Sequence, residues 1–249
     1  MARPGPSSPG SAGAPGPRVR LGMLVPSSNS NAETLTAALL AHRPDVGVHY
    51  SRFRLPPELG DAIDAAVLGD APSLLADAEL DAVAFHGTSG SWVGLDGDRN
   101  LSASLAAATG APATTASLAV VDALAALGAT RIAVVFPGPA PIADLIAQEY
   151  ARSGLEVVAT STPETVLSNP EIARLPAEDI ATLMRPAFVP DAEAVVCIGT
   201  NLRAGYLVPE FEREFGVPVV DSAVATLWKL LRLAGAAQPT PGWGRLFEV

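Results

Sequence analysis

Cysteine, histidine and aromatic residues are scarce in this chain, and each shortage removes a class of protein. The 249 residues include one cysteine, which excludes a disulfide framework and any zinc or iron–sulfur site built from several cysteines. The three histidines, His42, His49 and His86, lie in separate segments without metal-ligand spacing, so we expect no bound metal. Aromatic residues make up only 5% of the chain, and we therefore expect a core filled by small aliphatic side chains.

Positive charge is also in short supply. Sixteen Lys and Arg residues face 26 Asp and Glu residues, which gives a net charge of −10. Nucleic-acid phosphates and anionic membrane surfaces both require clustered Lys and Arg, so neither is expected as a partner. No apolar run approaches the roughly 20 residues that a membrane-spanning helix needs.

The first 17 residues consist mainly of Pro, Gly, Ser and Ala. They contain no apolar stretch of the kind found in a signal peptide, so a cytoplasmic location is the default expectation. Such a composition buries too little surface to offset the entropy of ordering. We therefore expect residues 1–17 to be a disordered tail.

From Arg20 onward, short apolar runs alternate with longer Ala- and Leu-rich patterns. This alternation predicts an α/β fold with parallel sheets covered on both faces. The expected strands are Arg20–Val25, Val46–Phe53, Asp81–Phe85, Ala113–Thr115, Arg131–Phe136, Glu156–Thr160, Ala194–Ile198 and Pro218–Val220. The expected helices include Ala32–Ala41, Asp61–Ala78, Leu118–Leu127, Ile142–Ser153, Glu178–Phe188 and Ala223–Leu233.

The second half of the sequence repeats landmarks of the first. The stretch Asp81–Thr88 resembles Glu193–Thr200, and each is followed by a helix and then by Gly-Ala-Pro or Gly-Val-Pro. We interpret this as a duplication that gives two α/β lobes, at 18–128 and 129–249. The sequence leaves open whether the chain crosses from one lobe to the other near its C-terminus. The alternative is that two Ala-rich stretches are alike by composition alone.

Three of the expected strands end in small polar residues: Val25–Asn29, Gly87–Ser91 and Gly199–Asn201. Hydroxyl, carboxamide and backbone N–H groups at such ends can bind an anionic oxygen. Open α/β sheets bind ligands at the carboxyl ends of their strands, so we expect the three clusters to face one cleft. Ordinary helix capping is the competing interpretation, since Ser, Thr and Asn are preferred N-caps.

Six motifs follow one another along the chain: Val25–Asn29, Thr88–Ser91, Asn169–Leu175, Thr200–Arg203, Gly216–Val220 and the ending Pro241–Phe247. Through these motifs, the sequence from about Arg20 to Phe247 resembles the branch of the aspartate/glutamate racemase superfamily that contains maleate cis-trans isomerases and arylmalonate decarboxylases. The resemblance implies two pseudo-symmetric Rossmann-like lobes with parallel sheets, an active-site cleft between them, chemistry without a cofactor, and a monomer or homodimer.

This chain departs from the family where the chemistry is expected. The resemblance implies reactive cysteines immediately before Thr88 and before Thr200 in racemases and maleate isomerases, and only the one before Thr200 in arylmalonate decarboxylases, which carry Gly at the first position. Here Gly87 and Gly199 occupy those positions, so both thiols are missing. Gly138 stands where relatives usually carry a tyrosine that holds a substrate carboxylate.

Two other residues are candidates for proton transfer. His86 precedes Gly87, and an imidazole titrates near neutral pH; a structural histidine at a strand end is the alternative. Cys197 lies two residues before Gly199 on the same face of the strand, but roughly 6.6 Å deeper, which favours a core role. Asp221 either acts as a base or, as we favour, caps the following helix.

The residues expected to contact a small carboxylate come from the three polar clusters, the Pro-Gly-Pro segment and the Asn169 motif. We therefore predict an enzyme that acts on a small carboxylate or dicarboxylate by decarboxylase, isomerase or lyase chemistry. The alternative is an inactive relative that binds or senses carboxylates, and a plain scaffold is least favoured. The predicted contacts are Ser28, Asn29, Gly87, Thr88, Ser89, Gly138, Asn169, Gly199, Thr200 and Asn201.

Overall fold

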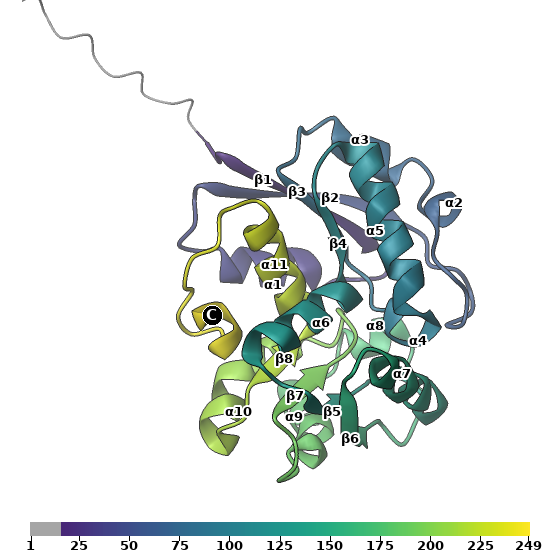
Figure 1. Cartoon of the computed structure of the whole chain (residues 1–249), viewed down its shortest axis with the longest axis vertical. Helices are drawn as coiled ribbons and strands as arrows, with labels where there is room; N and C mark the ends of the chain where they lie inside the picture. The colour runs from purple at the N-terminus through teal and green to yellow at the C-terminus, as the bar shows by residue number, and fades with distance from the viewer. Residues whose placement is uncertain (1–15) are drawn as a thin grey trace, which may run out of the picture.

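The computed structural model describes residues 16–249. Most of the expected disordered tail at 1–17 therefore lies outside the described residues. Within residues 16–249, eight strands form two separate four-stranded parallel sheets with helices around them (Figure 1). This arrangement confirms the α/β class and the two pseudo-symmetric lobes.

The two sheets repeat one strand order. The first sheet runs β2-β1-β3-β4 and the second runs β6-β5-β7-β8, so the first strand of each half lies inside its sheet. The strands are β1 (Val19–Pro26), β2 (Val46–Phe53), β3 (Ala82–Phe85), β4 (Ala113–Thr115), β5 (Arg131–Val135), β6 (Glu156–Ser161), β7 (Ala194–Cys197) and β8 (Val219–Asp221).

Helices fill the connections between the parallel strands. They are α1 (Ala32–Leu39), α2 (Ala65–Leu68), α3 (Ala71–Ala76), α4 (Gly90–Val93), α5 (Leu95–Thr109), α6 (Ala116–Leu127), α7 (Ala140–Arg152), α8 (Asn169–Ile172), α9 (Ala177–Met184), α10 (Val208–Phe215) and α11 (Ser222–Leu233). Three short 3-10 helices cover Arg185–Ala187, Ala204–Leu207 and Arg245–Glu248.

The inner strands are apolar on both faces, as parallel strands covered by helices must be. Every residue of β3 and of β7 is buried. In β3 the side chains alternate between two cores: Ala82 and Ala84 pack in the core that both sheets share, while Val83 and Phe85 pack against α3 and α5. This alternation decides which side chains at the strand end reach the site.

The last helix of each half joins the two lobes. Helices α6 and α11 pack against each other, α11 also contacts β3 and β4, and α6 contacts β8. Their apolar residues share a single core with β1 and β5. Figure 1 shows α11 and α6 lying between the two sheets. The carboxyl ends of the strands of both lobes are thereby held close together.

One expected helix is interrupted. The stretch Asp61–Ala78 forms two short helices, α2 and α3, instead of one. Gly69 separates them with a φ of +54°, a left-handed conformation that glycine adopts without a Cβ penalty. Residues 54–64 remain irregular before α2 begins, and this segment becomes part of the site.

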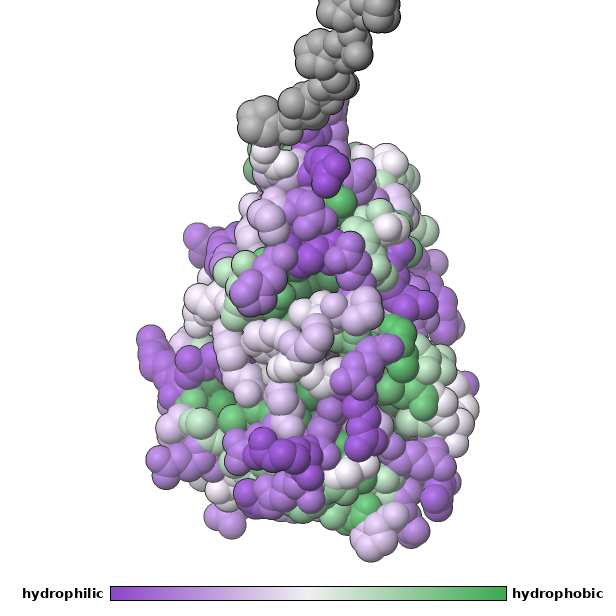
Figure 2. All heavy atoms as spheres, turned by 90° about the vertical axis from the view of Figure 1, so that its left-hand side faces the viewer, coloured by the Kyte–Doolittle hydropathy of each residue, from purple (hydrophilic) through white to green (hydrophobic). Residues whose placement is uncertain are grey.

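The outer surface is mixed in polarity. On the face shown in Figure 2, hydrophilic residues alternate with small apolar patches. No helix within residues 16–249 has both the length and the apolar character needed to cross a bilayer.

Candidate functional site

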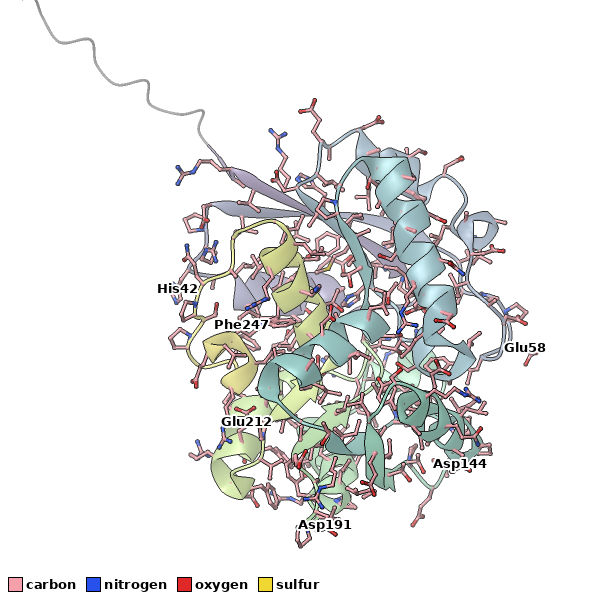
Figure 3. The ribbon with its side chains drawn as sticks, viewed as in Figure 1. His42, Glu58, Asp144, Asp191, Glu212 and Phe247 are labelled. Atoms are coloured by element: carbon pink, nitrogen blue, oxygen red, sulfur yellow. The ribbon has the colours of Figure 1, made fainter. Side chains whose placement is uncertain are left out.

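A pocket of about 190 Å³ lies where the carboxyl ends of the strands of both lobes meet. The segments after β1, β3, β5, β6 and β7 contribute to it, together with the irregular segment after β2. Figure 3 labels Glu58 on that segment, at the right-hand edge of the molecule. The lining residues are Pro26, Asn29, Leu55, Leu59, Ile63, Phe85, Gly87, Thr88, Ser89, Trp92, Phe136, Pro137, Gly138, Pro139, Val166, Leu167, Asn169, Ile172, Thr200 and Asn201.

The polar floor of the pocket is built by hydrogen bonds that cross from one lobe to the other. Asn29 Nδ2 donates to Thr200 Oγ1 at 3.0 Å, and Asn31 Nδ2 donates to the Thr200 carbonyl at 3.0 Å. The Thr200 hydroxyl in turn donates to the His86 carbonyl at 3.2 Å. The end of β1 is therefore fixed against the polar turn that follows β7.

Asn201 and Asn169 complete this connection. The Ser30 N–H donates to Asn201 Oδ1 at 3.1 Å, and Asn201 Nδ2 donates to the carbonyl oxygens of Ser28 at 3.3 Å and Asn169 at 3.0 Å. Asn169 Nδ2 donates to Ser28 Oγ at 2.7 Å. The Asn201 amide is therefore committed to protein partners, and its role is to hold the floor together.

Other donors at the floor remain free. The hydroxyls of Thr88 and Ser89 line the pocket and make no hydrogen bond within the described part of the chain. The backbone N–H groups of Gly87, Thr88 and Ser89 likewise meet no acceptor there, and neither do those of Thr200 and Asn201. Consecutive free N–H groups of this kind are able to donate to an anionic oxygen.

Aromatic rings fill the space beside two of the floor glycines. A Cβ at Gly87 would lie 2.6 Å from the Phe85 ring, and a Cβ at Gly138 would lie 2.5 Å from the Phe136 ring. These are the positions where relatives were expected to carry a cysteine and a tyrosine. At both positions the floor presents aromatic surface where a side chain would otherwise lie.

Gly199 excludes a side chain for a different reason. Its φ of +114° is a conformation that L residues rarely adopt, and a Cβ would lie 3.3 Å from Pro137. Gly199 does not itself line the pocket. The second expected thiol position is therefore closed by the backbone.

The structure places both proton-transfer candidates outside the pocket. His86 and Cys197 are fully buried, and neither is a lining residue. Burial lowers the pKa of His86 to about 4 and raises that of the Cys197 thiol well above its ordinary value. His86 thus stays neutral near pH 7 and both of its ring nitrogens lack a partner. Neither side chain has access to a ligand in the pocket.

Asp221 caps a helix in this structure. Its Oδ1 accepts from the N–H groups of Ala223 and Val224, both at 2.9 Å, at the start of α11. Burial raises its pKa to about 6. Asp221 is 1% exposed and does not line the pocket, so its geometry is that of a helix cap.

Among the described lining residues there is no Asp, Glu, His, Cys, Tyr, Lys or Arg. Within residues 16–249, no cluster of three or more His, Cys, Asp or Glu side chains is arranged to hold a metal ion. The walls are mostly apolar. Leu55, Leu59 and Val166 stand at the mouth with exposed fractions of 42%, 51% and 74%. The Trp92 indole N–H donates to the Leu59 carbonyl at 2.6 Å and fixes this side of the mouth.

Of the ten residues expected to contact a ligand, the pocket brings eight together. Ser28 and Gly199 are not among the lining residues, and the Ser28 hydroxyl accepts from Nδ2 of Asn169, which is a lining residue. The eight are Asn29, Gly87, Thr88, Ser89, Gly138, Asn169, Thr200 and Asn201.

Sequence reasoning missed the acid that supports the floor from behind. Asp98, on α5, is buried, and its carboxylate accepts from the Thr115 hydroxyl. It packs so closely under Gly90 that a Cβ there would lie 2.1 Å from its Cγ. Burial raises the pKa of Asp98 to about 6. Nothing local distinguished it from a surface acid in a polar helix.

Comparison with known proteins identifies the family of the chain. The family model for arylmalonate decarboxylase matches residues 60–247. The arylmalonate decarboxylase of Bordetella bronchiseptica is 31% identical over 233 residues, which cover 92% of this chain and 96% of that protein.

Two solved structures are similar over the same range. A variant of the maleate isomerase Iso from Pseudomonas putida S16, with maleate, has a TM-score of 0.83 at 27% identity and covers 92% of this chain and 97% of that one. A mutant of the Nocardia farcinica maleate cis-trans isomerase, with a covalently bound succinylcysteine intermediate, has a TM-score of 0.81 at 27% identity and covers 92% and 98%. The chain belongs to the arylmalonate decarboxylase family, in the branch of the aspartate/glutamate racemase superfamily that also holds the maleate isomerases.

Proposed function

We propose that the pocket binds a small dicarboxylate of the malonate type that carries an apolar substituent, and that the chain removes one carboxylate as CO2. The observation that carries this proposal is the composition of the pocket. Neutral donors at Gly87–Ser89 and Thr200–Asn201 form the floor, and apolar side chains form the walls, with no ionisable side chain among the described lining residues.

The donors suit the anion that decarboxylation produces. When the bond from the α-carbon to one carboxylate breaks, its electron pair passes to the α-carbon and on to the remaining carboxylate as an enediolate. The free N–H groups and the hydroxyls of Thr88 and Ser89 can donate to that enediolate. The α-carbon then takes a proton from water, which leaves hydroxide.

The walls suit the group that leaves. A carboxylate placed against Phe85, Phe136 or Ile172 loses its hydration without gaining a cation. Its conversion to neutral CO2 relieves that cost, which favours cleavage. The apolar substituent of the ligand would lie against the same walls and toward the mouth.

The pocket supports decarboxylation better than maleate-type isomerisation. One relative carries a covalent succinylcysteine intermediate, which requires a thiol at the substrate. In this chain Gly87 and Gly199 occupy the thiol positions, and Cys197 is buried elsewhere. Decarboxylation requires no covalent bond to the protein.

The test is to incubate the protein with phenylmalonate, methylmalonate and maleate, and to follow product by NMR and binding by calorimetry. We expect phenylmalonate to lose CO2, methylmalonate to react more slowly, and maleate to remain unchanged. The variant Thr88→Val removes one floor donor without changing its shape and should lower kcat/KM about tenfold or more, as expected for a lost hydrogen bond to a charged group. Thr109→Val, at the far end of α5, is the matched control and should leave the rate unchanged.

A second candidate function is binding without turnover, which the lack of an ionisable group at the pocket favours. It predicts saturable binding of phenylmalonate, weakened by Thr88→Val, with no product formed. Absence of both binding and turnover for all three acids would overturn both candidates.

A further inference from the structure

Arg52 holds the turn that follows β1. It lies near the end of β2, and its Nη1 donates to the carbonyl oxygens of Pro26 at 3.3 Å, Ser27 at 3.2 Å and Asn29 at 2.9 Å. Its Nη2 pairs with Glu33 in the first turn of α1. One guanidinium group thus fixes three carbonyl oxygens in the turn that presents Asn29 to the pocket.

The same guanidinium is connected to the floor through one peptide group. The carbonyl of Asn29, which accepts from Arg52, shares its peptide with the N–H of Ser30, and that N–H donates to Asn201 Oδ1. A hydrogen bond to a carbonyl polarises the peptide and strengthens the bond that its N–H makes. The Asn201 side chain in turn donates to the carbonyl oxygens of Ser28 and Asn169.

Arg52 lies outside the pocket and acts on it through the residues of the floor. No Lys or Arg is among the described lining residues, so a bound carboxylate meets no cation directly. The side chain of Arg52 is 41% exposed on the outer side of the turn, while Asn29 on its inner side is 3% exposed. The cation therefore supports the floor without occupying the pocket.

We propose that Arg52 is a positioning residue: it sets the shape of the 26–30 turn and polarises the Asn29–Ser30 peptide, and so raises the affinity of the floor for a carboxylate. The affinity part of this inference rests on the proposed function. A lysine cannot replace it fully, because the guanidinium bonds the turn carbonyls through Nη1 and Glu33 through Nη2, and an ammonium group has only one nitrogen for both tasks.

The first experiment compares affinities for phenylmalonate. Arg52→Ala should weaken binding about tenfold, the effect of about 1.4 kcal/mol, and Arg52→Lys should recover only part of the loss. The matched control is Arg54→Ala, because Arg54 is exposed, lies two residues further along and makes no hydrogen bond or ion pair within the described residues. It removes the same charge and should leave the affinity unchanged.

Chemical rescue separates positioning from general stability. Millimolar guanidinium chloride should restore the affinity of Arg52→Ala, while equal concentrations of sodium chloride or urea should not. Rescue by all three, or by none, would assign the loss to a general structural effect and overturn the inference.

A measurement without ligand keeps this inference separate from the proposed function. In nitrogen-15 NMR spectra, the Ser30 amide and the Asn201 side-chain amide should shift in Arg52→Ala, return with guanidinium, and stay in place in Arg54→Ala. Should Arg52→Ala fail to fold, Arg52→Lys gives the same comparison. Unmoved Ser30 and Asn201 signals would overturn the positioning role, whereas failure of the wild type to bind phenylmalonate would overturn the proposed function alone.

Discussion

At the scale of single residues, the most telling feature is the pairing of a glycine with an aromatic ring two positions earlier. Phe85 lies against Gly87 and Phe136 lies against Gly138, each with ring atoms where a Cβ would stand. Phe85 is fully buried and packs on Phe53 with ring centroids 5.4 Å apart, so it has little room to move. A side chain at either glycine would overlap the neighbouring ring, so the floor requires glycine at both positions.

This packing predicts a coupled pair of substitutions. Gly87→Ala should lower the free energy of unfolding by about 1–3 kcal/mol, because the new methyl group overlaps Cε1 and Cζ of Phe85. Phe85→Leu lacks those atoms, so in the double variant the cost of Gly87→Ala should fall by about 1 kcal/mol or more. Urea unfolding of the four proteins measures this coupling.

Gly97→Ala is the control for the backbone contribution. Gly97 lies in α5 with nothing within 4 Å of a Cβ, so the same substitution should stabilise the protein by up to about 1 kcal/mol. Equal effects at Gly87 and Gly97, or strict additivity of Gly87→Ala and Phe85→Leu, would contradict the role given to the ring.

At the scale of elements, the end of β3 sends neighbouring side chains to opposite faces. Phe85 lines the pocket, whereas His86, one residue on, is fully buried away from it. An imidazole without a hydrogen-bond partner in an apolar region resists protonation, and burial lowers the pKa of His86 to about 4, from 6.5. The end of β3 thus places His86 away from the pocket, where its protonation affects only the stability of the fold.

The lowered pKa predicts a pH dependence of stability with a definite sign. His86 is neutral in the folded state, so its contribution is fully present above pH 6.5 and is lost as the pH falls through 4. Between pH 7.5 and 4.5 this loss should reach about 2–3 kcal/mol. In His86→Leu the loss should vanish, and urea unfolding at several pH values measures the difference between the two proteins.

Two buried acids act in the opposite direction in both proteins. Burial raises the pKa values of Asp98 and Asp221 to about 6 from 3.8, so their contributions are present at low pH and are lost as the pH rises through 6. Because both acids remain in His86→Leu, the difference between variant and wild type isolates the histidine. A difference that does not change with pH would show that His86 is accessible to protons in the folded state.

The hydrophobicity pattern of the sequence predicts the strands and helices better than it predicts which segments contact one another. The apolar runs locate all eight strands, with Val219–Asp221 shifted by one residue from the expectation, and the polar strand ends do meet at one pocket. The alternation in β3 also follows from the pleat. The break between α2 and α3 was missed because Gly69 in an Ala-rich stretch is compatible with a continuous helix.

Contacts between distant segments account for what the sequence does not reveal. Nothing in the sequence around β2 indicates that Arg52 reaches three carbonyls after β1, because this depends on the pairing of Arg52 with Val25 in the sheet. The composition around Gly87 likewise does not show that the Phe85 ring has taken the space of a side chain. Tertiary packing decides both.

At the scale of the whole molecule, two different connections hold the lobes together. The first is apolar, where α6 and α11 pack between the sheets. The second is polar, where Ser28–Asn31 bonds to Asn169, Thr200 and Asn201 across the floor. The apolar connection brings the lobes together, and the polar one sets the pocket between them.

Asn201 is the centre of the polar connection, so its removal tests how much the floor contributes to joining the lobes. Its side chain is 3% exposed and bonds to Ser30, Ser28 and Asn169. In Asn201→Ala these partly buried or exposed groups lose their partner, which costs about 0.5–1.5 kcal/mol for each hydrogen bond. We expect a total loss of about 2–4 kcal/mol in the free energy of unfolding, as measured in urea.

The matched control is Asn100→Ala, since Asn100 is exposed on α5 and its side chain makes no hydrogen bond within the described residues. It should change stability by less than about 0.5 kcal/mol. Because α6 and α11 still join the lobes, Asn201→Ala should unfold in a single transition and lose affinity for phenylmalonate. If Asn201→Ala were as stable as Asn100→Ala, the polar floor would add nothing to the apolar connection, and the lobes would be held by the two helices alone.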